Sequence, residues 1–358
     1  MQRQPPATSP VTGRAHVDEG MVRVGPLMAL PAVLESLGIR ATPYLAEFGL
    51  TKSFFDDPEN TLPMAMGGRL LGQAAARTRC EHLGLLVGQR AGASALGALG
   101  YLIQSSDTVG TALDAFAEHL EVQDRAGTVW IESEGGFSTL GYTVFDAHVE
   151  SLEQILACAF AIATNLMVSI CDPQWRPTEV LFAFARPRQV EPYRKFFGVR
   201  PRFDAERSGL VFPNELLQAP IPSADPLLNM LMRDRVRELR QSIGDDVVAV
   251  VRRQLRMMVL TPNCTVALVA ARMNLHVRAL NRELAAAGTT FLRLREEARA
   301  ELACQLLEST RTGASEIAAI LGYTEQASFT RAFQRWTGLP PTRWRAARKP
   351  TGRENRGS

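Results

Sequence analysis

Between residues 24 and 87 the pattern is mostly helical, because apolar side chains recur three and four positions apart, as at Leu30, Val33, Leu34 and Leu37 and again at Met66, Leu70, Leu71 and Ala74. The period changes to strand-like alternation in 128–133 and 138–145, on either side of a Glu-Gly-Gly turn, which predicts a β-hairpin. An apolar run predicts a long buried helix over 152–170, and 179–184 is typical of a further strand. This part of the chain is therefore predicted to be an α+β domain.

Prolines mark the end of this first domain. Three of them between 220 and 226 precede a charged amphipathic segment over 227–239, which predicts a helix. A second helix is expected over 247–260. The helix over 227–239 is interpreted either as a dimer contact or as a plain linker, and the domain junction is predicted to lie within 222–245.

The stretch from Ser315 to Pro341 predicts two helices joined by a tight turn, and its sequence is SEIAAILGYTEQASFTRAFQRWTGLPP. Gly322 suits the end of the first helix, because glycine readily adopts the left-handed conformation found there. The second helix would bury Phe329 and Phe333 and turn a polar face outward. Two helices joined in this way form a helix-turn-helix, whose second helix enters the major groove of DNA.

A similar pattern lies about 49 residues earlier, where Leu280 takes the place of Phe329 and Leu284 that of Phe333. A repeat of this length favours two DNA-binding units over an ordinary helical hairpin. Between the copies, 291–310 carries one apolar stripe and predicts a helix of about 20 residues, roughly 30 Å long. That length is close to the ~34 Å of one DNA turn, so this helix is predicted to hold two recognition helices in successive major grooves.

The charge is distributed unevenly along the 358 residues. Residues 251–358 hold 18 Lys and Arg against 8 Asp and Glu, a net charge of +10, whereas the remainder of the chain has a net charge of −7. Only the C-terminal part is therefore expected to meet a polyanion such as DNA. On charge alone, a basic surface with no nucleic-acid partner is an equal alternative.

Five cysteines are scattered through the chain without any CxxC pair, a pattern typical of free thiols in a reducing compartment. The sequence has no GxSxG, HExxH, phosphate-binding glycine loop or cysteine–histidine metal spacing, so no catalytic residue, metal site or cofactor is expected. No apolar run is judged to approach the ~20 residues that span a bilayer. No membrane partner is therefore expected, and the predicted location is the cytoplasm.

Residues 262–345 resemble the C-terminal domain of the AraC/XylS family of bacterial transcription regulators. The diagnostic motif stands here as Ile317, Ala318, Leu321, Gly322, Tyr323, Ser328, Phe329, Arg331, Ala332, Phe333, Gly338 and Pro341. The resemblance implies a seven-helix domain that binds promoter DNA, with RNA polymerase as a further partner and no enzymatic activity. His276 departs from the pattern, because the family usually has a small serine cap at this position.

By motif position, the resemblance implies two sets of side chains that face DNA bases. In the first unit they are Arg278, Asn281 and Arg282. In the second unit they are Gln326, Ala327, Thr330 and Arg331. Arginine pairs naturally with guanine, and asparagine or glutamine with adenine, so both sets contain residue types that read bases.

The N-terminal domain is similar to the regulatory domain of a subset of these regulators, including ones that respond to ornithine or arginine. That domain is often labelled arabinose-binding, a label that does not establish the ligand. A small-molecule effector is therefore expected, in a pocket between the hairpin and the helices packed on it. The candidate lining residues are Tyr101, Gln123, Trp130, Tyr142 and Phe160.

Two other interpretations use the same DNA-binding region. An architectural DNA binder without a ligand would be expected to have a basic N-terminal half, and this half is acidic. A DNA-repair enzyme with a fused DNA-binding module would need a reactive cysteine in a recognisable setting, and the metal-binding cysteines of such enzymes have no counterpart here. Both remain alternatives to an effector-controlled regulator.

The predicted organisation divides the chain into five segments. They are a disordered tail over 1–20, an α+β regulatory domain over 21–222, a linker helix over 223–244, an all-α DNA-binding domain with two helix-turn-helix units joined by a long helix over 245–346, and a basic tail over 347–358. Since each chain has two recognition helices, a monomer can already read two half-sites, and a homodimer is an alternative.

Overall fold

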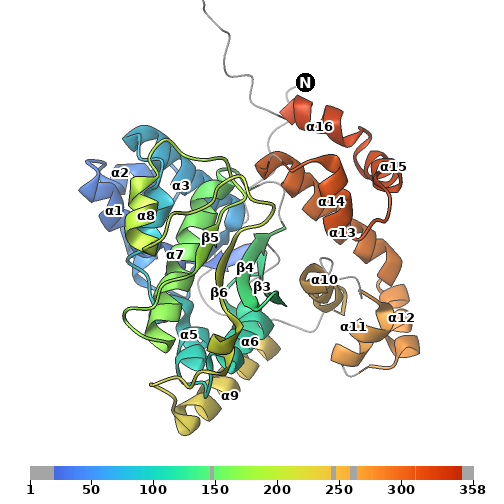
Figure 1. Cartoon of the computed structure of the whole chain (residues 1–358), viewed down its shortest axis with the longest axis horizontal. Coiled ribbons are helices and arrows are strands. Elements are labelled where there is room, and N and C mark those ends of the chain that lie inside the picture. The colour runs from blue at the N-terminus through green and yellow to red at the C-terminus, as the bar shows by residue number, and fades with distance from the viewer. Residues whose placement is uncertain are drawn as a thin grey trace, which may run out of the picture.

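The computed structural model describes residues 20–145, 149–242, 247–258, 264–273, 275–310 and 312–348. The tails predicted over 1–20 and 347–358 lie outside these residues, apart from Gly20 and residues 347 and 348. An N-terminal part of helices and strands is followed by a C-terminal part made of helices, and the two stand side by side (Figure 1). The predicted fold class is confirmed.

A four-stranded antiparallel sheet of order β3-β4-β6-β5 lies in the N-terminal part. Its strands are β3 (Gly127–Glu134), β4 (Phe137–Val144), β5 (Glu179–Leu181) and β6 (Gly209–Pro213). A separate two-stranded sheet pairs β1 (Met21–Arg23) with β2 (Thr61–Pro63). The predicted hairpin is β3–β4, and Gly135 and Gly136 in its turn have φ of +58° and +86°, a conformation that favours glycine.

The strand predicted over 179–184 is shorter than expected. It ends at Leu181, because the chain then turns from β6 toward Arg202, whose carbonyl accepts the backbone N–H of Phe182 at 2.8 Å. The Phe182 ring is fully buried among other aromatic rings, stacked on Phe203 at 5.6 Å between centroids. Aromatic packing therefore replaces strand pairing in this segment.

Helix α7 (Leu152–Ile170), predicted from its apolar run, is the central helix of the N-terminal core and packs on β4 and β6. Among the described residues it is the one helix long and apolar enough to cross a membrane, which corrects the expectation that no apolar run approaches this length. Of its most apolar stretch, 72% is buried inside the protein. Such burial is what a core helix of this composition shows.

The other helices of the N-terminal part surround α7 and the sheet (Figure 1). They are α1 (Leu30–Ser36), α2 (Ala41–Ala46), α3 (Met64–Thr78), α4 (Leu83–Gly88), α5 (Gly97–Gln104), α6 (Val109–His119), α8 (Glu191–Phe197), and the 3₁₀ helices η1 (Gly25–Leu27), η2 (Lys52–Asp56), η3 (Ala93–Leu96), η4 (Leu120–Val122) and η5 (Asn214–Gln218). Helix α4 can pack closely against α7 because Gly84 has no side chain. A Cβ at this position would lie only 2.1 Å from the Gln154 carbonyl oxygen.

Helix α9 (Pro226–Ser242) leads to seven helices in the residues described from 247 onward. They are α10 (Val247–Met258), α11 (Val266–Arg272), α12 (Val277–Ala286), α13 (Phe291–Ser309), α14 (Ala314–Ile320), α15 (Gln326–Thr337) and α16 (Pro341–Arg348). The first predicted helix-turn-helix is α11–α12, the second is α14–α15, and α13 is the long helix between them.

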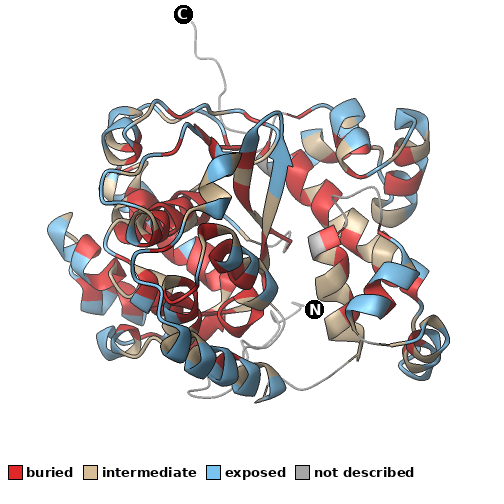
Figure 2. Cartoon of the chain, turned by 60° about the horizontal axis from the view of Figure 1, so that its bottom comes forward, coloured by how far each residue is buried: buried red, intermediate tan, exposed pale blue. Residues whose placement is uncertain are grey.

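Each helix-turn-helix unit has its own hydrophobic core, and α13 contributes to both. The first core contains Leu280 and Leu284 of α12 together with Leu294 of α13. The second contains Phe329 and Phe333 of α15 together with the later α13 residues, among them Leu302 and Leu306. In Figure 2 the helices of this part are buried along the sides that face one another and exposed on their outer sides. With its 19 residues, α13 extends about 28 Å.

Candidate DNA interface and ligand cavity

Local chemistry fixes the start of the first recognition helix and the end of the helix before the second. The Nδ1 atom of His276 accepts a hydrogen bond from the backbone N–H of Arg278 at 3.2 Å, so the residue that replaces the usual serine still caps α12. In the second unit, Gly322 has a φ of +76° between α14 and α15. This is the left-handed conformation expected of the glycine that ends the first helix.

The side chains predicted to face bases lie on the outward sides of α12 and α15, opposite the buried residues. Those that are exposed are Arg278, Asn281, Arg282, Gln326, Ala327 and Arg331. Thr330 is half-buried, and its hydroxyl donates to the backbone carbonyl of Gln326 at 3.0 Å. In Figure 1 both helices lie on the side of the C-terminal part that is turned away from the N-terminal part.

Ion pairs divide the arginines of this region into two groups. Arg335 is held 2.8 Å from the carboxylate of Glu296 on α13. Within the described part of the chain, no carboxylate pairs with Arg278, Arg282 or Arg331. These three guanidinium groups can therefore meet phosphates or base edges without first breaking an ion pair.

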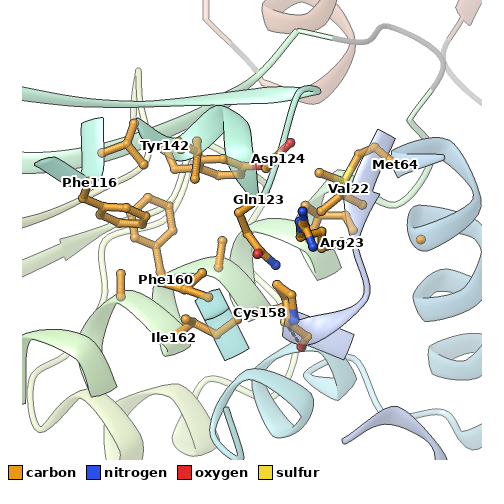
Figure 3. A pocket seen from close by; sticks show the side chains of 18 of the residues that line it. Val22, Arg23, Met64, Phe116, Gln123, Asp124, Tyr142, Cys158, Phe160 and Ile162 are labelled. Carbon is orange, nitrogen blue, oxygen red and sulfur yellow. Dashed lines mark hydrogen bonds between the residues drawn. The ribbon is translucent and has the colours of Figure 1, made fainter. Parts of the chain in front are cut away.

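A cavity of about 90 Å³ lies inside the N-terminal part, between α7, the β3–β4 hairpin and the segment around η4 (Figure 3). Most of its lining side chains are apolar. Three of the five pocket residues predicted from the sequence line it, namely Gln123, Tyr142 and Phe160. The sequence therefore located the cavity at the hairpin and α7, but identified its wall only in part.

The other two predicted pocket residues lie elsewhere. Tyr101 on α5 is 46% exposed and is not part of the cavity wall. Trp130 lies on the opposite face of the hairpin, where its Nε1–H donates to the Thr143 hydroxyl at 3.0 Å. The Arg207 guanidinium stacks 3.6 Å from the centroid of the Trp130 ring. Trp130 is therefore a packing residue of the outer sheet face in this structure.

Three polar residues of the cavity wall were not predicted from the sequence: Arg23, Asp124 and Cys158. Arg23 stands between Val22 and Val24, and a single charge inside an apolar run is a usable sign of a buried ion pair. Asp124 and Cys158 have no comparable signal, because their place depends on which elements pack together.

A buried carboxyl–phenol pair forms one side of the cavity. The Tyr142 hydroxyl donates to Asp124 Oδ2 at 2.5 Å, and Asp124 Oδ1 accepts from the backbone N–H groups of Ala126 and Gly127 at 2.8 and 3.0 Å. Burial raises the pKa of Asp124, while these hydrogen bonds oppose the rise. Burial and the Asp124 carboxylate raise the pKa of Tyr142 well above its usual value, so Tyr142 remains a neutral donor.

The wall of the cavity also contacts the C-terminal part. Gln123 and Asp124 face the cavity, whereas Glu121 of η4 faces the helices beyond it. Glu121 Oε1 lies 2.5 Å from Nε of Arg240 on α9, and its other oxygen pairs with Nε of Arg253 on α10. Burial lowers the pKa of Arg253, and the attraction of Glu121 opposes this. One short segment therefore joins the cavity to the DNA-binding region.

A second connection follows β4. Phe145, directly after this strand, is 1% exposed and belongs to the core of the second helix-turn-helix unit. The guanidinium of Arg256 on α10 lies 5.5 Å from the centroid of its ring. Since Tyr142 lies in β4, three residues before Phe145, the cavity wall and the second unit share one segment of backbone.

The contact between the two parts is expected to be sensitive to acid through His119. Burial lowers the pKa of His119 from 6.5 to about 4, helped by Arg240, Arg233 and Arg253 and opposed by Glu118. The unfolded chain therefore binds a proton at a higher pH than the folded chain, and stability should fall as pH drops from about 6.5 toward 4. Between pH 7 and pH 5, the free energy of unfolding of a His119→Gln variant should fall by about 2 kcal/mol less than that of the unchanged chain. Urea unfolding at pH 7 and pH 5 measures it, and equal pH dependence in both chains would contradict it.

Comparison with known proteins agrees with this architecture. A family model described as "Arabinose-binding domain of AraC transcription regulator, N-term" matches residues 38–221, and one described as "Helix-turn-helix domain" matches residues 269–347. The first match alone covers more than half of the chain.

Related proteins align along most of the chain. It is 29% identical over 298 residues to the ornithine utilization regulator of Pseudomonas aeruginosa, covering 82% of this chain and 86% of that one. It is 26% identical over 339 residues to the HTH-type transcriptional regulator VirS of Mycobacterium tuberculosis, covering 93% and 98%. The crystal structure of the transcriptional regulator CdpR from Pseudomonas aeruginosa matches with a TM-score of 0.44 and 22% identity, over 88% of this chain and 97% of that one. The chain belongs to the AraC-type transcription regulators, with an N-terminal ligand-binding domain and a C-terminal helix-turn-helix domain.

Proposed function

We propose that this regulator reads two half-sites on promoter DNA with α12 and α15, and that a small molecule in the N-terminal cavity controls it. The outward faces of the two recognition helices carry this proposal, because they present arginines without a carboxylate partner among the described residues. The proposed base contacts are Arg278, Asn281 and Arg282 in the first unit and Gln326, Ala327, Thr330 and Arg331 in the second.

Affinity and specificity would come from different groups on this surface. The net charge of +10 in residues 251–358 supplies attraction to phosphates, which does not depend on base sequence. Arg282 and Arg331 can each donate two hydrogen bonds to guanine, while Asn281 can pair with adenine. Ala327 offers a methyl group for contact with thymine. Each half-site would therefore contain a short run of specified base pairs.

Selection of binding sites from a random duplex library with the full chain tests the proposal. Two half-sites are expected, with centres about 10 base pairs apart, because α13 holds the two units on one rigid helix. Binding at matched salt should fall when five base pairs are inserted between the half-sites, since this turns one of them to the other side of the DNA. Enrichment of a single half-site, or tolerance of the insertion, would contradict the proposal.

Effector control would act through η4 and α10. Val251 and Leu255 of α10 belong to the core of the first helix-turn-helix unit, and Arg253 between them is paired with Glu121. A ligand that moves η4 would change this ion pair and with it the position of α10. The equilibrium shifts only if the ligand binds one of the two arrangements more tightly.

Two further partners belong to this proposal. Action at promoters implies RNA polymerase in the cytoplasm as a partner, which in vitro transcription from a selected site would test. Leu227, Met230 and Leu231 form an exposed apolar face on α9, which is proposed as a homodimer contact. Sedimentation as a monomer at micromolar concentration would contradict the dimer.

A further inference from the structure

We propose that the N-terminal cavity takes a small, mainly apolar molecule that carries a single hydrogen-bond donor, and that it does not take a sugar. This assignment rests on the proposed effector control and names the chemical class of the ligand. The volume of the cavity, the polar atoms in its wall and the position of Gln123 lead to it.

Most polar atoms of the wall are already used by the protein itself. The Arg23 guanidinium donates from Nε to the Val122 carbonyl at 2.6 Å and forms an ion pair with Glu59. The Tyr142 hydroxyl is bound to Asp124 at 2.5 Å. Few hydrogen-bonding groups are therefore left for a ligand.

The same holds for the other two polar residues of the wall. The second oxygen of Asp124 accepts two backbone N–H groups. The Cys158 thiol lies 3.7 Å from the Pro26 carbonyl oxygen, to which it donates. A sugar places a hydroxyl on almost every carbon, and each hydroxyl buried without a partner opposes binding. An apolar ligand has no hydroxyl groups that need hydrogen-bond partners in the wall.

Gln123 supplies a free hydrogen-bond acceptor in this wall. Its side chain is buried, and its Nε2 donates to the Ala95 carbonyl at 3.2 Å. No hydrogen bond to its Oε1 is recorded among the described residues. Figure 3 shows the Gln123 amide reaching into the middle of the cavity, between Arg23 and Cys158. A ligand with one hydroxyl, such as a phenol or an alcohol, fits this wall, because a hydroxyl can donate to Gln123 Oε1 and accept from Nη2 of Arg23, which has no hydrogen bond among the described residues.

The size of the cavity limits the ligand further. At about 90 Å³ it is smaller than the roughly 150 Å³ apolar cavity that is known to bind benzene. A single ring would therefore require a small movement of the wall. Met64 lines the cavity, and an unbranched methionine side chain adapts to such changes more easily than other apolar residues.

Calorimetry on the purified full chain without DNA tests this assignment with three probes: phenol, benzene and L-arabinose. Phenol and benzene should bind saturably, with phenol about fivefold tighter, the effect of one added hydrogen bond. Arabinose should not bind at the same concentrations. Binding of arabinose, equal affinity for phenol and benzene, or no binding of any probe would overturn the assignment.

Two variants locate the binding. Gln123→Met keeps a side chain of similar length without the acceptor, so the preference for phenol over benzene should fall to near onefold. Gly67→Ala adds a methyl group that meets Leu27 and Ile155 at 3.6 and 3.8 Å without a clash, so the fold should be kept while both probes bind about threefold or more weakly. Probe binding unchanged by both variants would place it outside this cavity. The selection of DNA sites does not depend on which ligand the cavity binds. A chain that selects two half-sites but binds arabinose would therefore overturn this ligand assignment and leave the proposed DNA reading intact.

Discussion

Replacing Glu121 with Gln is expected to lower the free energy of unfolding by about 2–3 kcal/mol. The Glu121 side chain is 3% exposed and pairs with both Arg240 and Arg253. Glutamine has nearly the same size but leaves the two guanidinium groups close together without the buried negative charge that pairs with both. The loss should stay below the about 3–5 kcal/mol of a fully buried pair, because Arg240 and Arg253 are 34% and 22% exposed and water screens them. Urea unfolding measures the difference.

The matched control for this variant is Glu118→Gln. Glu118 lies on the preceding turn of α6, 3.8 Å from the same Arg240, but its side chain is 65% exposed. An exposed pair of this kind contributes about 0–1 kcal/mol. Equal unfolding midpoints for the two variants would show that the burial of Glu121 does not matter. If a cavity ligand changes DNA affinity through η4, that change should also shrink in Glu121→Gln and persist in Glu118→Gln.

Replacing Arg331 with Ala is expected to weaken binding to the selected DNA site by about 1–3 kcal/mol, or about 5- to 150-fold. Arg331 is exposed on the outward face of α15, and its only described hydrogen bond as a side-chain donor goes to the Ser328 hydroxyl at 3.2 Å. A guanidinium in this position can bind the edge of a guanine with two hydrogen bonds. Gel-shift titration at fixed salt measures the loss, and the equivalent Arg282→Ala change should produce a similar one in the first unit.

Arg335→Ala provides the matched control on the same helix. It removes the same charge from α15, but Arg335 is held by Glu296 at 2.8 Å and is not proposed to reach a base. The affinity for DNA of random sequence should fall by the same small factor in both variants, since only the attraction to phosphates changes. On the selected site, Arg331→Ala alone should show the large loss. Equal losses on that site would remove Arg331 from the base contacts.

The helix-turn-helix units could be predicted from sequence because their signals are local. Gly322, Phe329 and Phe333 fix a turn and a buried face within a few residues, and the repeat at Leu280 and Leu284 supports them. No long-range pairing has to be guessed. His276 was the exception in this pattern, and its ring nitrogen turned out to do the capping that a serine hydroxyl would do.

The cavity could be predicted only in part, because its wall is assembled from segments far apart in the chain. Gln123, Tyr142 and Phe160 come from three different elements, and nothing in the spacing of these residues shows that they meet. For Trp130, the register of the hairpin alone predicts a place outside the cavity. A two-residue turn at Gly135 and Gly136 pairs Tyr142 with Val129, so the neighbouring Trp130 must face the other side of the sheet.

Phe145 shows that the division between sensor and reader along the sequence is not the division between hydrophobic cores. A fragment that began at Val247 would contain both helix-turn-helix units, yet the cluster around Leu302 and Phe333 would lose the ring that Phe145 supplies. The apolar surface that Phe145 covers would then be exposed to water, and the fragment would tend to associate through it. The two parts are therefore not independent folding units. A sensor exchanged for that of another regulator would have to supply an aromatic side chain at the position of Phe145 as well as a matching linker.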